Sequence, residues 1–403
     1  MAGILSQDRS MGPAVGSGGA LMLESVSLNL SGERFGVIYH LDGDEANAHA
    51  RASDICFEQT VEFPSDLVPP GDIREFIVGH IETFEEIADS LFQVKINYAL
   101  ETSGFELVQL LNVVYGNISI KPGIRVMALE LPEILLDAFR GPRFGREGLR
   151  TLMHVPERSL LCTALKPMGY SARKLAEFTY QFALGGIDII KDDHGLTNQS
   201  FSPFKERVEY CTAAVERANL ETGRNCIYMP NITAPANQVI ENARFARSIG
   251  AGGLLVSPGL TGFDVMRQIA DDDKISLPIM SHPTFMGSFV TSPFQGISHY
   301  ALYGQIIRLA GADASIFPNY GGRFSFSREE CKNIADGTKT PMGHIKPIFP
   351  APGGGMSLAS IPEMNQLYGQ DVIYLIGGNL HRQGEDLIES SRRFLELVAT
   401  QPD

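Results

Sequence analysis

The feature that most constrains the fold is a series of short apolar runs in the second half of the chain. Eight of them recur between Ser159 and Asn379, and each ends in polar, Gly or Pro residues before a helical stretch. They are SLLCTAL, GIDIIKDD, CIYMPNIT, GGLLVSP, LPIMSHP, ASIFPNYGG, IKPIFPAPGGG and VIYLIGGN. Such alternation is typical of parallel strands that are buried on both faces. Because there are eight units and no GxGxxG fingerprint, the pattern predicts a closed (β/α)8 TIM barrel rather than an open doubly wound sheet.

A different pattern precedes the barrel region. RFGVIYHL and LFQVKINYAL alternate as half-buried strands do, and residues 71–91 predict an amphipathic helix. We therefore expect an α/β protein with a smaller N-terminal α+β domain over 31–145 and the barrel domain over 146–403. FRGPRFGREGLR, with its Pro and Gly residues, predicts the junction, and the Gly- and Ser-rich residues 1–30 predict a flexible arm.

Composition excludes several classes of function. The 403 residues carry a formal net charge of −14, which argues against broad binding of nucleic acid or of an anionic membrane. No apolar run reaches the roughly 18 residues that a bilayer span needs, and no signal peptide is recognisable. The five cysteines are scattered without a CxxC pair, which favours reduced thiols. A cytoplasmic enzyme is the expectation.

Polar residues gather where the predicted barrel strands end, and barrel enzymes build their active sites at this end. The residues that we expect to converge there follow seven of the eight runs. They are Lys166, Lys191, Asp193, His194, Asn231, His282, Arg323, Gly354, Gly355, Gly377, Gly378 and Asn379.

Lys191 and Asp193 suggest a metal site. Strand alternation sends both to one side and Asp192 to the other. A lysine and a carboxylate hold a divalent ion only if the lysine loses its positive charge, and carbamylation by CO2 would achieve this. The product would offer oxygen ligands, which Mg²⁺ prefers. An ordinary Lys–Asp salt bridge that closes a barrel strand is the alternative, and spacing alone leaves it open.

The remaining candidates each have two interpretations. Glycine backbones after the last two strands can bind a phosphate through free N–H groups, or they can be simple turns. Lys166 is either an acid or base with a lowered pKa or a solvated surface lysine. His282 is a general base, a phosphate donor or a strand-end histidine without a chemical role.

Several motifs together resemble the large subunit of RuBisCO and its relatives, the RuBisCO-like proteins. CTALKPMGYS followed by GGIDIIKDDHGL resembles the first two barrel strands of that family. FEQTVEFP, VYGNIS, FRGPRFGREGLR, RLAGADA and IKPIFPAPGGG extend the similarity from about residue 30 to the C-terminus.

The resemblance implies roles for individual residues. Lys191 matches the lysine that is carbamylated, Asp193 and His194 match positions of metal ligands, and Lys166 matches the lysine of proton transfer. The phosphate-binding backbone is implied to be Gly354, Gly355, Gly377 and Gly378, with Asn379 beside it. Glu58 and Asn117 match residues that one subunit lends to the active site of its partner, which implies a homodimer or an assembly of dimers.

The departures from the family pattern bear on the reaction. His194 stands where the family has a second carboxylate, and an imidazole is a poorer partner for Mg²⁺. Pro283, Met286 and Arg323 replace residues of true carboxylases, so we do not expect CO2 fixation. Substitutions at residues 62–64 alter the region that grips a second phosphate, which implies a substrate with one phosphate.

The expected function is proton abstraction next to the carbonyl of an acyclic keto-sugar monophosphate. The resemblance implies an isomerase or tautomerase of the 5-methylthioribulose 1-phosphate type, with an enediolate stabilised at the site. Two alternatives stay open. One is a decarboxylase, or a transcarboxylase or hydrolase, acting on a 3-oxo sugar-acid phosphate, and the other is a non-catalytic sensor or scaffold.

Overall fold

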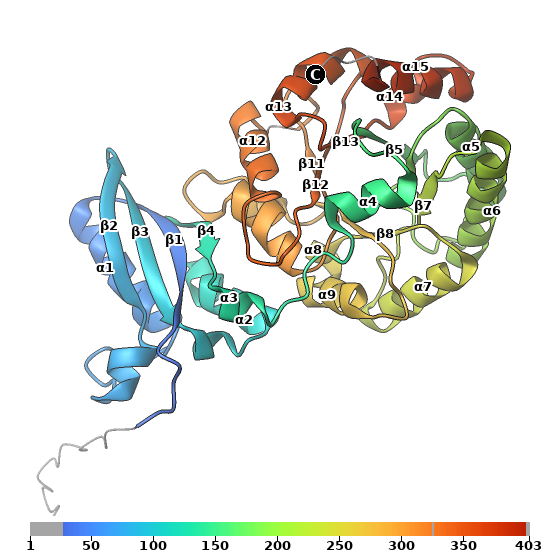
Figure 1. Ribbon diagram of the computed structural model, residues 1–403. Coiled ribbons are helices and arrows are strands. Elements are labelled where there is room, and N and C mark those ends of the chain that lie inside the picture. Colours follow the sequence, from blue (N-terminus) through green and yellow to red (C-terminus); the bar gives the residue numbers. More distant parts are fainter. Residues whose placement is uncertain (1–26, 325, 400–403) are drawn as a thin grey trace, which may run out of the picture.

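The computed structural model describes residues 27–324 and 326–399, and most of the predicted N-terminal arm lies outside them. The chain forms a small sheet-containing domain beside a larger ring of strands and helices (Figure 1). The fold class predicted from the apolar runs is confirmed.

The N-terminal domain is built on a five-stranded sheet in the order β10-β4-β1-β3-β2. Every second residue of β1 is buried, because one face of the sheet packs against helices. Helix α1 begins where the Asp44 side chain accepts a hydrogen bond from the N–H of Asn47 at 2.8 Å. The elements are β1 (Arg34–Asp42), α1 (Glu45–Glu58), β2 (His80–Ala88), β3 (Leu91–Ala99), α2 (Leu107–Tyr115), β4 (Ile124–Glu130), α3 (Glu133–Leu136) and β10 (Gly296–Ile297), with a π-helix at Ile73–Ile77 and 3-10 turns at Leu100–Ser103 and Asn117–Ile120.

The helix predicted over 71–91 is wrong. Only Ile73–Ile77 forms one turn of π-helix, and His80–Ala88 is strand β2, which pairs antiparallel with β3. β2 lies at the edge of the sheet, where Ile81 and Phe84 pack against the core and Ile87 is exposed, and the spacing of these apolar residues imitates a helical period. Its pairing with the neighbouring strand overrides that local signal. The strands predicted from RFGVIYHL and LFQVKINYAL are confirmed as β1 and β3.

All eight predicted barrel strands are present. Parallel pairing links β13-β5-β6-β7 and β12-β11-β9-β8. The barrel closes where β12 runs beside β13 and where the N–H of Leu255 in β8 donates to Pro230 O after β7 at 2.9 Å. The strands are β5 (Leu160–Leu165), β6 (Ile189–Asp192), β7 (Ile227–Met229), β8 (Leu254–Val256), β9 (Ile279–Ser281), β11 (Ala314–Pro318), β12 (Phe349–Gly353) and β13 (Ile373–Leu375).

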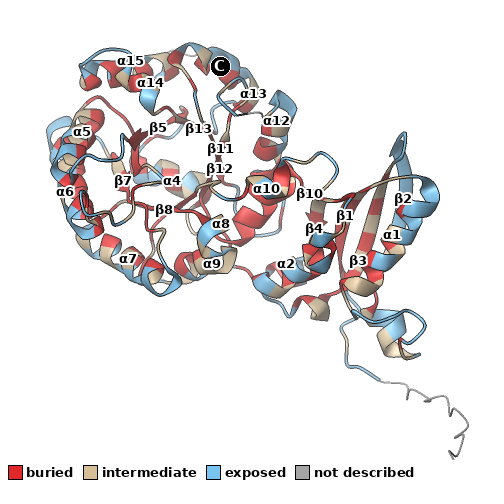
Figure 2. Cartoon of the chain, turned by 180° about the vertical axis from the view of Figure 1, so that it is seen from behind, coloured by how far each residue is buried: buried red, intermediate tan, exposed pale blue. Residues whose placement is uncertain are grey.

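Helices surround the barrel and their inward faces are buried (Figure 2). Helix α4 (Gly145–Met153), formed by part of the predicted junction, is different. Its Leu149 and Met153 pack into the apolar interior between the strands, so it plugs the end of the barrel opposite the strand C-termini. The others are α5 (Ala172–Leu184), α6 (Phe204–Thr222), α7 (Ala236–Ile249), α8 (Pro258–Thr261), α9 (Phe263–Asp271), α10 (Gly287–Val290), α11 (Ile307–Leu309), α12 (Arg328–Gly337), α13 (Ile361–Tyr368), α14 (Gly378–His381) and α15 (Leu387–Ala399), with a π-helix at Ala301–Ile306 and a 3-10 turn at Leu358–Ser360.

The two domains are joined by a strand pairing and by side-chain contacts to the backbone. β10, which follows the fifth barrel strand, adds to the N-terminal sheet by parallel pairing with β4. The Gln305 side chain bonds both the N–H and the carbonyl of Leu129, each at 2.8 Å. These contacts fix the N-terminal sheet against the barrel. In the stretches that the structure describes, no helix is long and apolar enough to cross a bilayer.

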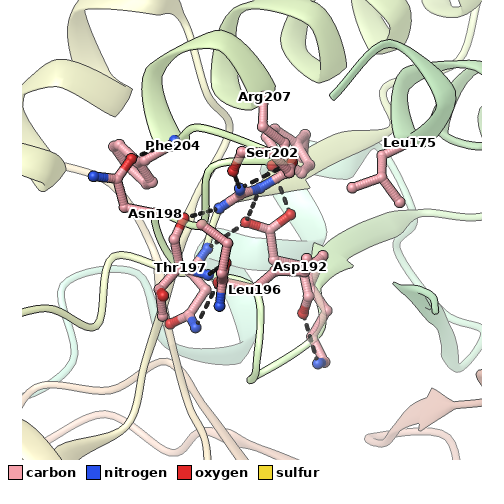
Figure 3. A network of polar contacts seen from close by, with 12 residues as sticks. Leu175, Asp192, Leu196, Thr197, Asn198, Ser202, Phe204 and Arg207 are labelled. Atoms are coloured by element: carbon pink, nitrogen blue, oxygen red, sulfur yellow. Dashed lines mark hydrogen bonds and ion pairs between the residues drawn. The ribbon is translucent and has the colours of Figure 1, made fainter. Parts of the chain in front are cut away.

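A buried ion pair secures the second barrel strand (Figure 3). Asp192 and Arg207 of α6 have fully buried side chains, and Arg207 Nε lies 3.0 Å from Asp192 Oδ2. Tyr228 OH donates to Asp192 Oδ1 at 2.8 Å, and Arg207 Nη1 donates to Ser202 O at 2.7 Å. Burial alone would lower the pKa of Arg207, but the charge and hydrogen bond of Asp192, together with Tyr228 and Cys211, outweigh burial and raise that pKa.

We expect Asp192→Ala to lower the free energy of unfolding by about 3–5 kcal/mol, because Arg207 would be left charged and unpaired in the interior. Asp336→Ala is the control: it breaks surface pairs with Lys332 and Lys339, and a loss of at most about 1 kcal/mol is expected. Urea unfolding at matched protein concentration measures both. Equal effects of the two substitutions would contradict the structural role of Asp192.

Candidate active site

A cavity of about 1100 Å³ opens at the C-terminal ends of the barrel strands. Eleven of the twelve predicted barrel residues line it, and the exception is Asn231. They are Lys166, Lys191, Asp193, His194, His282, Arg323, Gly354, Gly355, Gly377, Gly378 and Asn379. The structure therefore brings these eleven residues together, whereas the role of each residue remains a prediction.

Asn231 supports the site from outside the cavity. Its N–H donates to Asp192 Oδ2 at 3.0 Å, and its side-chain amide donates to the carbonyls of His194 and Leu196 at 2.9 and 3.0 Å. These bonds hold the loop after β6 in shape. Asn231 thereby fixes the backbone that carries Asp193 and His194.

Asp193 is the centre of the charged groups in the cavity. Its Oδ1 lies 2.7 Å from Lys166 Nζ and 3.4 Å from His194 Nδ1. Partial burial by itself would raise the pKa of Asp193. The hydrogen bonds from His194 and Lys166 and the nearby Lys191 charge outweigh burial and hold that pKa well below its usual range. Asp193 is therefore an anion throughout the physiological range.

Lys191 is almost fully buried, with 1% of its surface exposed. Its Nζ donates to the backbone carbonyl of Asp192 at 3.0 Å. Burial lowers the pKa of Lys191, and the neighbouring acidic groups oppose this shift only in part. A lowered pKa raises the share of neutral amine, which is the form that reacts with CO2.

His282 lines the cavity beside His194. Its ring stacks on that of His194 with centroids 4.7 Å apart and planes 11° apart. The N–H of Thr284 donates to His282 Nδ1 at 3.2 Å, so in the neutral ring the proton is on Nε2. Burial, with the charges of Lys191 and His194, lowers the pKa of His282 well below its usual value. His282 is a neutral ring with an N–H to donate.

Two glycine loops form another part of the wall. Gly354 and Gly355 follow β12 with φ angles of +85° and +106°, which side chains rarely adopt. The Arg323 N–H donates to Gly354 O at 3.0 Å, and the Asn379 amide bonds to Met356 O, so both flanking loops are tied to this one. A methyl group added at Gly378 would meet nothing within 4 Å, so open space lies beside the backbone of the second glycine loop.

Glu58 and Asn117 lie in the N-terminal domain and do not line the cavity of their own chain. Asn117 Nδ2 donates to Glu58 Oε1 at 3.0 Å, and Lys121 Nζ lies 3.7 Å from Glu58 Oε2. One chain therefore does not bring these two residues to the barrel cluster.

Sequence reasoning missed several residues of the cavity wall. Arg382, Thr284, Tyr303, Phe326 and Met356 all line it. Arg382 had a usable signal, since it follows the Gly377–Gly378 pair by a few residues. The aromatic pair had none, because Tyr303 belongs to a π-helix and Phe326 to the loop after β11, and only the fold brings them together.

Comparison with known proteins identifies the family. The model of the RuBisCO large chain catalytic domain matches residues 146–322. A RuBisCO-like protein of Rhodopseudomonas palustris, whose crystal structure is known, is 37% identical, with a TM-score of 0.83 over 92% of this chain and 99% of that one. The chain belongs to the RuBisCO large-chain family. The relatives that share about this level of sequence identity are RuBisCO-like proteins rather than true carboxylases.

Two further relatives have names that state an activity. The 5-methylthioribulose-1-phosphate isomerase of Rhodospirillum rubrum is 36% identical over 91% of this chain and 96% of its own length. The 2,3-diketo-5-methylthiopentyl-1-phosphate enolase of Geobacillus kaustophilus is 33% identical over 88% of this chain and 89% of its own.

The donor groups of this RuBisCO-like site suit a divalent ion only if Lys191 is modified. The described residues contain no group of three His, Cys, Asp or Glu side chains that could hold a metal. Asp193 offers one anionic oxygen and His194 an imidazole. A carbamate on the buried Lys191 would add a second anionic group, and with it the set fits Mg²⁺.

We expect wild-type protein in ¹³C-bicarbonate and Mg²⁺ to give a carbamate signal in its carbon NMR spectrum. Lys191→Ala should abolish that signal, because the neutral buried amine would be lost. Lys174→Ala, which removes an exposed amine on α5, is the control and should retain it. A wild-type spectrum without the signal would refute a carbamate at Lys191.

Proposed function

We propose that this RuBisCO-like chain is an isomerase or tautomerase of an acyclic keto-sugar monophosphate, of the 5-methylthioribulose 1-phosphate type. The observation that carries the proposal is the cluster of Lys166, Lys191 and Asp193 in one cavity with two glycine loops. The names of the isomerase and enolase relatives support it, since both contain a keto compound with a methylthio group at C5 and a phosphate at C1.

The proposed isomerisation moves a proton between two neighbouring carbons and another between their oxygens. The C–H bond of the hydroxyl-bearing carbon next to the carbonyl breaks, the proton goes to a base, and the electron pair forms the C=C bond of an enediolate with negative charge on the former carbonyl oxygen. The proton of the neighbouring hydroxyl passes to that oxygen, and return of a proton to the former carbonyl carbon leaves the new carbonyl on the neighbouring carbon. Lys166, about one-third exposed in the cavity and paired with Asp193, is the group that we assign to hold and return the proton.

The other residues orient the substrate and stabilise the negative charge that develops on it. His282, with its proton on Nε2, donates to the developing oxyanion, and the glycine loops bind the phosphate. Lys191 as a carbamate, with Asp193 and His194, would hold Mg²⁺, and the bound ion would polarise the carbonyl.

Assay in deuterated water tests the proposal. We expect 5-methylthioribulose 1-phosphate to isomerise with deuterium appearing on carbon and without release of CO2. Lys191→Ala should reduce turnover by at least about a hundredfold, because charge stabilisation in the reaction is lost. Lys332→Ala, on the exposed face of α12, is the control.

The alternatives give different outcomes in the same assay. Stoichiometric CO2 from a 3-oxo sugar-acid phosphate, without isomerisation, would favour the decarboxylase. Turnover of the 2,3-diketo phosphate alone would favour the enolase. No turnover of any of these compounds would contradict the proposal and leave the sensor or scaffold.

We also propose that the active unit is a dimer in which Glu58 and Asn117 reach the cavity of the partner subunit. Asn117 is exposed and Glu58 partly so, and neither lines the cavity of its own chain. Phe63, 46% exposed nearby in sequence, would come with them and offer an apolar contact to the far end of the substrate.

Mixing two inactive variants tests the shared site. Lys191→Ala and Glu58→Ala, unfolded and refolded together, should regain about one quarter of the wild-type sites, because random pairing makes half the dimers mixed, each with one intact site. Each variant refolded alone should stay inactive. A mixture no more active than its components would refute the shared site.

A further inference from the structure

The cavity is asymmetric in charge. Around the barrel, β11, β12, β13 and β5 are consecutive neighbours. The loops that follow these four strands contribute Arg323, the two glycine pairs, Arg382 and Lys166 to the wall. On the far side, the wall is formed after β9 by His282, Pro283, Thr284, Gly287 and Thr291. No Lys or Arg from that side lines the cavity among the described residues.

Not every cation on the charged side is available to a ligand. Lys166 is paired with Asp193, and Lys191 is buried with a lowered pKa. Arg323 lies with its guanidinium carbon 5.2 Å from the ring centroid of Phe324 and has no carboxylate partner within the described residues.

Among these cations, Arg382 has the fewest contacts with other described residues. It ends α14, and its side chain is exposed and has no hydrogen bond, ion pair or ring contact with any described residue. It lines the main cavity together with Gly377 and Gly378, and it also lines a smaller pocket with Lys174, Gln181 and Glu385. Although the chain has a net charge of −14, no carboxylate of the described residues forms an ion pair with this guanidinium.

We infer that Arg382 is a specificity-determining residue that binds the single phosphate of the substrate beside the loop of Gly377 and Gly378. The inference rests on the phosphorylated substrate class of the proposed function. A planar guanidinium can give two parallel N–H bonds to a phosphate, which a lysine cannot match. The cation-free far side leaves no equivalent for a second phosphate, so a monophosphate with an uncharged far end fits.

The test compares Arg382→Gln and Arg382→Lys with the control Arg392→Gln, which removes an exposed charge on α15 away from the cavity. Three quantities are measured: the Kd for inorganic phosphate by calorimetry, and KM and kcat for the keto-sugar phosphate. We expect Arg382→Gln to weaken phosphate binding and raise KM about ten- to a hundredfold, with kcat less affected. Arg382→Lys should recover part of this, and Arg392→Gln should resemble wild type.

A fourth variant separates the two pockets. Lys174→Gln changes only the smaller pocket, and we expect it to bind phosphate like wild type. Loss of phosphate binding in Lys174→Gln but not in Arg382→Gln would overturn the inference. So would a folded Arg382→Gln, with an unchanged circular dichroism spectrum, that has the KM and Kd of the control.

Failure of the inference and failure of the proposed function can be told apart. If wild type isomerises the substrate and Arg382→Gln does so with unchanged KM, the inference is wrong and the function stands. If wild type turns over none of the tested sugars but binds phosphate through Arg382, the function is wrong and the phosphate site stands. A wild type that binds no phosphate overturns the inference.

Discussion

Alternation of side chains along β6 is the constraint on which the rest of the site depends. Asp192 points outward and forms the buried ion pair with Arg207, while Lys191 and Asp193 point into the cavity. A shift of one residue in this strand would bury the wrong groups on both sides. The outward pair therefore fixes which side chains the cavity receives.

The side chains that point into the cavity, Lys191 and Asp193, influence each other's protonation state. Burying an isolated lysine as a cation is unfavourable in free energy, and the pKa of Lys191 is lowered for this reason. Asp193 stays ionised because Lys166 and His194 bond to it. A stable anion therefore lies beside an amine that is easily neutralised, and perturbed pKa values of this kind cluster at functional sites.

The barrel was predictable because its signal is repeated and physical. Eight buried parallel strands must be apolar throughout, and each of the eight runs became a strand. The position of the site in the barrel was predictable as well, because the strand C-termini meet in every such barrel. The helix expected over 71–91 was wrong because edge strand β2 takes its conformation from pairing with β3, which lies beyond the reach of a local pattern.

The cavity wall was predictable only in part. Thr284, Tyr303 and Phe326 reach the cavity from loops and from a π-helix, whose paths no periodicity describes. Asn231 was expected in the cavity wall, yet it holds the loop after β6 from behind, since a strand-end position does not fix a side-chain direction. Glu58 is a case of another kind, because its predicted role depends on a second chain.

The decisive measurement is a crystal structure with a keto-sugar monophosphate analogue, grown with Mg²⁺ and bicarbonate. We expect the phosphate to lie between the loops of Gly355 and Gly377, with the carbonyl oxygen directed at Lys191 and Asp193. A phosphate bound instead beside Pro283, with the carbonyl remote from Lys191, would contradict the proposed site.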